Sequence, residues 1–378
     1  MRLALNAVPL LSPWTGIGQY TYQVARGLLE ARDVEVFFFY GTGWSRQLRH
    51  SPSPAVNSAK STFMRWVPNA QAVMMAILRQ RFGAGVRKYK PHVYHEPNFL
   101  AHPFAGPTVL TVHDLSWIRH PEAHPADRVA KMQRYFAPSL ARASLILTDS
   151  EFVRQELQDV FSVEPGRIRT VLLGVEDMFR PMPPLQTRAV LDRFGLRHGS
   201  YLLAVGTLEP RKNLQLVLRS YLQLPGAVQK EFPLVLAGMS GWKTSALEQQ
   251  IGPLVQSGHV RLTGYVERAD LVALMSGATT LVYPSLYEGF GLPPLEAMAC
   301  GAPVIASGVA SLPEVVGDAG VLVDPHDAQA LAHEIMRLVE SPSLRAELSR
   351  RAIRRAAGFT WQRCVDQTVQ AYRDVAAH

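Results

Sequence analysis

Short apolar runs alternate with longer amphipathic segments along almost the whole chain. The apolar runs are rich in Val, Ile, Leu and Phe, which is typical of strands buried on both faces of a parallel sheet. The segments between them carry apolar residues at helical spacing, so they predict helices that cover the sheet. The predicted strands are residues 3–8, 34–40, 93–95, 108–112 and 145–148, then 201–205, 234–237, 260–262, 280–283, 303–306 and 321–323. The main predicted helices are residues 19–30, 127–142, 151–161, 214–224, 243–256, 269–276, 294–300 and 361–376.

A proline cluster interrupts this alternation. Pro181, Pro183 and Pro184 fall within four residues, and proline continues neither a helix nor a central strand. We therefore expect an α/β protein with two doubly wound, Rossmann-like domains, residues 1–180 and 185–358, that face each other across a cleft. We expect residues 359–378 to form a helix that packs back toward the N-terminal domain. In such sheets ligands bind beyond the carboxyl ends of the strands, so the loops that follow strands are the place to look for function.

Composition excludes several classes of protein. The 378 residues include two cysteines, Cys300 and Cys364, which is too few for a disulfide scaffold or a structural zinc cluster. No apolar run is long enough for a transmembrane helix, and the first residues predict a strand rather than a signal peptide. We therefore expect a cytoplasmic protein.

The net charge of +8 is concentrated in one segment. Residues 36–95 contain no Asp or Glu, whereas the rest of the chain is almost neutral. Such a segment attracts phosphates on nucleic acid, on anionic lipid or on a pyrophosphate-linked acceptor. Its nine bases are Arg46, Arg49, Lys60, Arg65, Arg79, Arg81, Arg87, Lys88 and Lys90.

Two glutamates follow the predicted strand at 280–283. Glu288 and Glu296 lie eight positions apart, around a Gly-x-Gly turn and a Pro-Pro pair that suits the first turn of a helix. The start of a helix binds anions, and carboxylates beside it can accept hydrogen bonds from hydroxyls. The pattern therefore suits a nucleotide sugar. From spacing alone, a helix with an acidic start and a turn-capping glutamate is the open alternative.

Two adjacent cations, Arg211 and Lys212, follow the first strand of the second domain. Arg can grip a phosphate with two hydrogen bonds and Lys adds a compact charge, although an ordinary solvated pair is the alternative. We expect this pair at the surface of the cleft, and we expect Asn213 to cap the following helix.

The first domain has weaker candidates. Gly16 and Gly18 form a Gly-x-Gly after the first strand, which permits close approach to a ligand. His113 could donate to a substrate, with Asp114 to orient it; a loop His beside a capping Asp is the alternative. At the next strand end we expect Asp149 or Ser150 to cap a helix, and no motif suggests a metal ion.

Taken together, these motifs resemble the retaining glycosyltransferases of the GT-B fold, and most closely the family known as GT4. The resemblance covers the whole chain and includes the E-x7-E motif of Glu288 and Glu296, the run around it, and the Arg211–Lys212 pair. It implies a metal-independent transfer of a sugar from a nucleotide diphosphate, with retention of anomeric configuration and no added cofactor.

The resemblance also implies roles for single residues. Arg211 and Lys212 are expected to bind the donor diphosphate, Glu288 the sugar hydroxyls, and Glu296 the ribose. The amides of Phe290, Gly291 and Leu292 are expected to face the phosphates or the sugar. From the first domain, the loop with Gly16 and Gly18 is expected at the diphosphate and His113 beside the reacting sugar.

The likeness is strongest to bacterial O-antigen mannosyl- or rhamnosyltransferases, which implies a GDP-sugar donor and a lipid-linked glycan acceptor. A UDP- or dTDP-sugar enzyme and a catalytically silent scaffold of a polysaccharide complex remain alternatives. A nucleic-acid-binding protein explains the basic segment but not the phosphate and polyol motifs, so we expect no nucleic acid.

The basic segment suggests a membrane surface. Residues 60–90 mix cations with Trp, Phe, Met and Leu, and residues 70–82 contain good helix formers. A basic, apolar helix lies well in a membrane interface, so we expect peripheral association with the inner face of the cytoplasmic membrane. The alternative is that Val73, Ile77 and Leu78 pack on the sheet and the cations are solvated.

Overall fold

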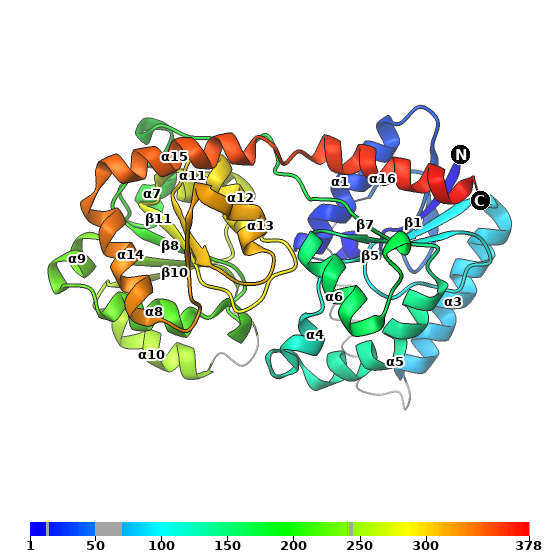
Figure 1. The fold of residues 1–378 in the computed structure, drawn as a ribbon, viewed down its shortest axis with the longest axis horizontal. Helices are drawn as coiled ribbons and strands as arrows, with labels where there is room; N and C mark the ends of the chain where they lie inside the picture. The colour runs from blue at the N-terminus through cyan, green and yellow to red at the C-terminus, as the bar shows by residue number, and fades with distance from the viewer. Residues whose placement is uncertain (13–14, 50–69, 240, 242–244, 378) are drawn as a thin grey trace. The chain divides into compact units, whose positions relative to one another are not determined.

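The computed structural model describes residues 1–12, 15–49, 70–239, 241 and 245–377 (Figure 1). The chain forms two compact units. Unit 1 consists of Met1–His113, Ala130–Gly174 and Trp361–His378, and unit 2 of Asp114–Val129 and Val175–Thr360.

Unit 1 is built on a seven-stranded sheet of order β3-β2-β1-β4-β5-β6-β7. All neighbouring strands are parallel except β3, a short strand antiparallel to β2 that the sequence pattern did not predict. The strands are β1 (Arg2–Asn6), β2 (Glu35–Phe39), β3 (Trp44–Ser45), β4 (Val93–Glu96), β5 (Thr108–Val112), β6 (Leu145–Thr148) and β7 (Ile168–Thr170). The helices are α1 (Gly16–Glu30), α3 (Ala70–Tyr89), α5 (Ala126–Arg142), α6 (Glu151–Phe161) and α16 (Trp361–Ala376).

Unit 2 contains a six-stranded, fully parallel sheet of order β10-β9-β8-β11-β12-β13. The strands are β8 (Leu202–Val205), β9 (Leu234–Ala237), β10 (Val260–Gly264), β11 (Thr280–Tyr283), β12 (Val304–Ser307) and β13 (Val321–Val323). The helices are α4 (Ser116–Arg119), α7 (Pro184–Arg193), α8 (Leu214–Leu222), α9 (Gly226–Glu231), α10 (Ser245–Gln256), α11 (Arg268–Gly277), α12 (Leu292–Ala299), α13 (Leu312–Val316), α14 (Ala328–Glu340) and α15 (Pro342–Ala356).

The apolar runs form the strands because their side chains are buried on both faces. Every residue of β5, β6 and β11 is buried, as expected of central parallel strands. The α/β prediction with two Rossmann-like sheets is therefore confirmed. The proline cluster does not form a linker throughout, because Pro184 begins α7, where a proline at the first helical position loses no hydrogen bond.

The limits of the two units differ in part from the predicted domains. The chain leaves unit 1 after Gly174 and returns after Thr360, and Val175 pairs with Thr360 in a parallel bridge. The segment Asp114–Val129 groups with unit 2, although the sequence placed it inside the first domain.

The C-terminal helix α16 belongs to unit 1. It packs against α1, and a Cβ at Gly27 of α1 would lie 2.5 Å from a methyl group of Val365. The Tyr372 hydroxyl and His95 Nδ1 on β4 are joined by a buried hydrogen bond of 2.7 Å. These contacts attach the end of the chain to the sheet of unit 1.

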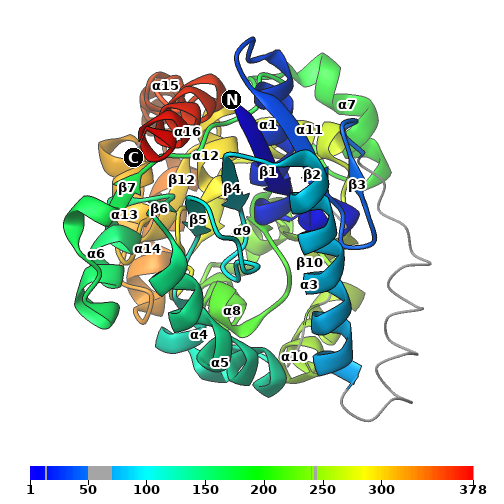
Figure 2. The same ribbon diagram turned by 90° about the vertical axis from the view of Figure 1, so that its right-hand side faces the viewer.

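Helix α3 carries part of the basic segment and packs beside β2 (Figure 2). Phe82 is 1% exposed and meets Phe39 on β2, whereas Ile77 is 39% exposed. Residues 60–69 lie outside the described residues, as does the side chain of Val73. No helix in the described part of the chain combines the length and apolarity needed to cross a membrane.

Candidate functional site

The loop that carries Glu288 is held by its own backbone and by one serine. Gly291 has φ +114°, a conformation that favours glycine, and it precedes the first residue of α12. The Ser311 hydroxyl donates to the carbonyl oxygens of Glu288 at 2.9 Å and Phe290 at 2.7 Å. Pro293 and Pro294 lack amide protons, so neither can donate a hydrogen bond at the start of α12.

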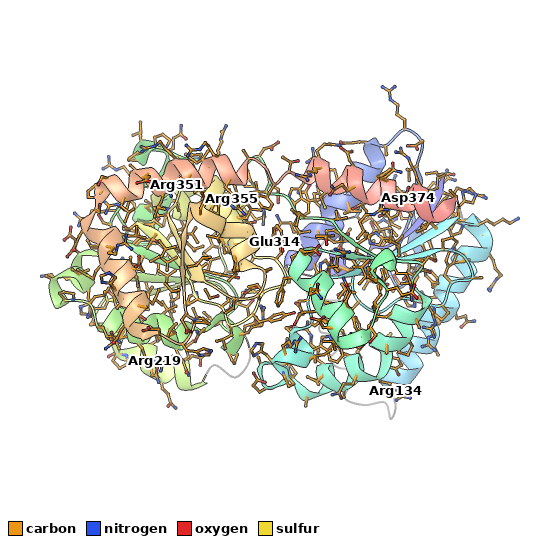
Figure 3. All side chains as sticks on the ribbon, in the orientation of Figure 1. Arg134, Arg219, Glu314, Arg351, Arg355 and Asp374 are labelled. Atoms are coloured by element: carbon orange, nitrogen blue, oxygen red, sulfur yellow. The ribbon has the colours of Figure 1, made fainter. Side chains whose placement is uncertain are left out.

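Helix α15 supports this region of unit 2. Arg355, labelled with Glu314 in Figure 3, donates to the carbonyl oxygens of Val315 at 2.6 Å and Glu314 at 2.7 Å. These carbonyls lie near the end of α13, where backbone acceptors have no partner within the helix. The bonds therefore fix α13, the helix that follows Ser311.

Glu288 lies at the centre of a buried charge cluster. Its carboxylate is 2.7 Å from Lys212 Nζ, 3.0 Å from Arg211 Nη1 and 3.0 Å from the Tyr283 hydroxyl. Burial alone would raise the pKa of Glu288, but the opposite charges of Arg211 and Lys212 outweigh it and lower the pKa to about 2. The carboxylate therefore stays ionised.

The two cations are largely enclosed, so they are not the ordinary solvated pair that was the alternative. The side chains of Arg211 and Lys212 are 14% and 12% exposed. Arg211 also donates to the Tyr287 carbonyl and to the Glu209 carboxylate, both at 2.6 Å. Burial is tolerated because two carboxylates, Glu209 and Glu288, compensate the two positive charges.

The electrostatic consequences differ between the two cations. Burial lowers the pKa of Lys212, and the attraction of Glu288 offsets only part of this effect. The pKa of Arg211 is raised, because Glu288 and Glu209 outweigh the effect of burial. Arg211 is therefore a permanent positive charge, held with a defined orientation by three acceptors.

The sequence analysis missed two members of this cluster, Glu209 and Tyr283. Glu209 could have been noticed as a carboxylate two residues before Arg211 in the same loop. Tyr283, which accepts a hydrogen bond from Lys212 Nζ at 2.5 Å, is the last residue of β11 and resembles any strand aromatic. No sequence signal distinguishes it.

Asn213 does not cap α8 with its side chain, contrary to the prediction. It lies in the left-handed region at φ +57°, and its side-chain amide donates to Pro284 O at 3.0 Å and Pro325 O at 2.7 Å. The amide thereby ties together the loops that follow β8, β11 and β13. Asn tolerates this backbone conformation better than most residues.

Glu296 is buried on α12 and contacts a different arginine. It is 4% exposed, and its Oε1 accepts from Arg268 Nη2 at 3.2 Å. Arg268 is the first residue of α11 and was absent from the predicted set. Of the predicted residues in unit 2, the structure therefore joins Arg211, Lys212 and Glu288 in one cluster and gives Glu296 a partner of its own.

In unit 1, Gly16 and Gly18 belong to the first turn of α1 rather than to a loop. Thr15 caps this helix, and its hydroxyl accepts from the Gly18 amide at 3.3 Å. Residues 13–14, which precede this cap, lie outside the described residues.

His113 is oriented by Asp149, not by Asp114. Its Nδ1 is 2.6 Å from the Asp149 carboxylate and its Nε2 is 2.8 Å from the Pro97 carbonyl. The pair forms because the neighbouring parallel strands β5 and β6 end at the same edge. Asp114 instead accepts from the Ser116 amide and hydroxyl.

The capping prediction for the following helix holds for one of its two candidates. The hydroxyl of Ser150 caps α6 and accepts from the Val153 amide at 3.3 Å, which leaves Asp149 to pair with His113. Within the described residues, no group of three or more His, Cys, Asp or Glu side chains could hold a metal ion.

Comparison with protein families gives a consistent result for both halves of the chain. A family model for Glycosyltransferase Family 4 matches residues 14–178, and one for Glycosyl transferases group 1 matches residues 196–355. The O-antigen chain mannosyltransferase B of Escherichia coli is 38% identical over 379 residues, covering 99% of this chain and 100% of that protein.

Solved structures have the same fold. The sucrose-phosphate synthase of Thermosynechococcus elongatus superposes with a TM-score of 0.76 and 23% identity, over 100% of this chain and 99% of that one. HepE of Anabaena, solved with UDP-glucose, gives a TM-score of 0.71 and 18% identity over 99% of both chains.

Proposed function

Because this chain belongs to the family 4 glycosyltransferases and has the GT-B fold, we propose that it transfers mannose from GDP-mannose to a growing cell-surface glycan of the O-antigen type. The observation that carries this proposal is the buried cluster of Arg211, Lys212 and Glu288 in unit 2. The choice of mannose is supported by the 38% identical relative, which is named an O-antigen mannosyltransferase.

The cluster suits the departure of a nucleotide diphosphate. When the bond between the anomeric carbon and the diphosphate oxygen breaks, negative charge develops on the leaving group. Arg211 and Lys212 stabilise that charge, and their positions are already fixed by Glu209, Glu288 and Tyr283. Stabilisers that need no reorganisation, in a site of low dielectric constant, give the largest effect.

The transfer proceeds with retention and without a metal ion. The acceptor hydroxyl attacks the anomeric carbon from the face that the diphosphate leaves, and its proton passes to an oxygen of the leaving phosphate. Glu288 orients the sugar hydroxyls. The two cations and the start of α12 take the place of Mg²⁺ as charge stabilisers.

A panel of nucleotide sugars tests the donor. The full chain is incubated with GDP-mannose, GDP-rhamnose, UDP-glucose and dTDP-rhamnose, with a lipid-linked glycan as acceptor, and released nucleotide is measured. We expect the fastest release with GDP-mannose. Faster release with GDP-rhamnose, or with a UDP or dTDP donor, would mean that the donor assignment is wrong. No release with any donor would favour a catalytically silent scaffold.

The acceptor is a glycan on a membrane lipid, and α3 holds the enzyme at the inner face of the cytoplasmic membrane. Phe82 anchors α3 to the sheet, while Ile77, Arg79, Arg87 and Lys88 are exposed. Each exposed cation near an anionic surface contributes about 1 kcal/mol of attraction. Several exposed cations on one helix suit the surface of an anionic membrane.

Liposome co-sedimentation tests the membrane contact. In the α3 variant, Arg79, Arg87 and Lys88 are changed together to Glu. The matched control changes three exposed residues of unit 2 to Glu, so that the total charge is the same: Arg219, Arg350 and Arg354. We expect wild type and control to pellet with anionic vesicles at low salt and the α3 variant to stay in solution. Equal pelleting of the two variants contradicts the assignment to α3.

A further inference from the structure

Arg268 connects the buried glutamate of α12 to the segment by which the chain enters unit 2. Its Nη2 donates to Glu296 Oε1 at 3.2 Å and to Glu176 Oε1 at 2.5 Å. Its guanidinium carbon also lies 4.9 Å from the centre of the Phe179 ring. Three different contacts therefore fix one side chain that is only 20% exposed.

Glu296 needs such a cation. Its side chain is 5% exposed, and a buried carboxylate is costly unless an opposite charge or hydrogen bonds accompany it. Arg268 supplies this opposite charge through a hydrogen bond to Oε1 of the carboxylate. A carboxylate accepts hydrogen bonds, so Glu296 suits hydroxyl donors rather than phosphates.

We propose that Arg268 is a positioning residue for recognition of the nucleotide's ribose. It holds the Glu296 carboxylate so that this group accepts hydrogen bonds from the vicinal 2′- and 3′-hydroxyls. Glu176 and Phe179 also contact Arg268, so the same side chain stabilises the chain segment just after Val175. This inference rests on the proposed function and on the role at the ribose that the resemblance to the family 4 glycosyltransferases implies for Glu296.

The competing explanation is that Arg268 only stabilises the chain segment just after Val175. In that case its loss would weaken unit 2 as a whole and would affect every nucleotide equally. A positioning role makes a narrower prediction, because it affects only nucleotides that have the hydroxyls. Comparison of a ribonucleotide with its dideoxy analogue separates the two explanations.

Calorimetry on the full chain provides the test, with GDP and 2′,3′-dideoxy-GDP as the two ligands and the corresponding UDP pair in parallel. We expect wild type to bind GDP about 10- to 100-fold more tightly than the dideoxy analogue, as for hydrogen bonds to a charged group. In Arg268→Ala, GDP affinity should fall by about 10-fold and the analogue's affinity should change little. The preference of the protein for GDP over its dideoxy analogue should therefore be largely lost.

Three further variants make the test decisive. Arg268→Lys keeps the charge but loses the planar guanidinium, so it should retain part of the preference for GDP over its dideoxy analogue. It replaces Arg268→Ala in the test if that variant does not fold. Glu176→Gln leaves the contact between Arg268 and Glu296 in place and should lower the melting temperature with the preference intact. In a Glu296→Gln background, Arg268→Ala should have no further effect on GDP binding.

The outcomes distinguish this inference from the proposed function. If wild type binds each nucleotide and its dideoxy analogue equally well, the assignment of Glu296 to the ribose is wrong. If wild type prefers the ribonucleotide but the Arg268 variants keep that preference in full, Arg268 is only a brace and the inference is overturned. In that second case the proposed function remains intact.

Discussion

Both units bury a glutamate near the end of a strand, but Glu288 in unit 2 lies against two cations, whereas Glu96 in unit 1 accepts hydrogen bonds from neutral groups. In unit 2, Glu288 is accompanied by Arg211 and Lys212, and its pKa falls to about 2. In unit 1, Glu96 at the end of β4 is equally buried and accepts only neutral donors, from Asn6 at 2.7 Å, Tyr94 at 2.6 Å and the Asn98 amide at 3.1 Å. Burial therefore dominates and raises the pKa of Glu96 to about 7.

The histidines of unit 1 follow the same rule. Burial lowers the pKa of His95 to about 3 and that of His102 to about 4, so both rings are neutral at physiological pH. The comparison teaches that burial decides the charge of a group only when no opposite charge is buried with it. Unit 2 buries Glu288 together with the charges of Arg211 and Lys212, whereas burial favours the neutral forms of Glu96, His95 and His102 in unit 1.

The largest expected effect comes from removing the charges of unit 2. Arg211→Ala or Lys212→Ala should each reduce turnover by on the order of 10²–10³, as for the loss of one fixed stabiliser. Because Glu288 is buried and loses both of its cations, the double variant should also lose about 3–5 kcal/mol of unfolding free energy. Steady-state rates and urea unfolding measure the two effects.

A charge-balanced variant separates stability from catalysis. Lys212→Met combined with Glu288→Gln removes both charges at once and should be clearly more stable than Lys212→Met alone, with activity still lost. Near-normal turnover in the double Ala variant contradicts the role of the cations in charge stabilisation.

The next effect concerns the two glutamates of unit 2. Glu288→Gln should lower turnover by about 10- to 100-fold, because a charged hydrogen-bond acceptor for the sugar is lost. It should not weaken binding of free GDP, since it removes an anion from beside Arg211 and Lys212. Glu296→Gln should weaken GDP binding itself. Calorimetry with GDP alone distinguishes them, and equal losses of affinity would mean that the division of roles is wrong.

A smaller effect is expected from Glu96 in unit 1, and it depends on pH. The folded protein raises the pKa of Glu96 from 4.5 to about 7, so it binds this proton more tightly than the unfolded chain does. The resulting stability is present below about pH 4.5 and is lost as the pH rises through 7, a change on the order of 3 kcal/mol. Glu96→Gln should remove this slope.

Urea unfolding between pH 4.5 and 8 measures the slope, with the exposed Glu164→Gln as the matched control. If the unfolding free energies of wild type and Glu96→Gln depend on pH in the same way, Glu96 does not hold a proton in the folded protein. The contrast with unit 2 would then disappear.

No effect at all is expected from EDTA on turnover. Arg211 and Lys212 carry the positive charge that a divalent ion supplies elsewhere, so chelation should leave the rate unchanged within error. Loss of activity on chelation and its recovery with Mg²⁺ would mean that the two cations are insufficient. The metal-free mechanism would then have to be abandoned.

The sequence by itself located most of the strands and the loop that carries both glutamates. Hydrophobic periodicity is local, so it located β5, β6, β9, β11 and β13 at their observed bounds. The E-x7-E motif could likewise be found because one loop and the helix after it carry both glutamates. The rule that proline continues neither a helix nor a central strand predicted a linker at Pro184. This residue instead begins α7, because proline also suits the first position of a helix.

Only the tertiary structure decided which distant residues meet. Asp149 rather than Asp114 orients His113, because the order of the strands in the sheet sets the partner. Tyr283, Glu209 and Arg268 acquire their roles through contacts across loops, and the burial of Arg211 and Lys212 follows from the carboxylates that surround them. Pairing between loops depends on strand order and packing, which local sequence patterns do not encode.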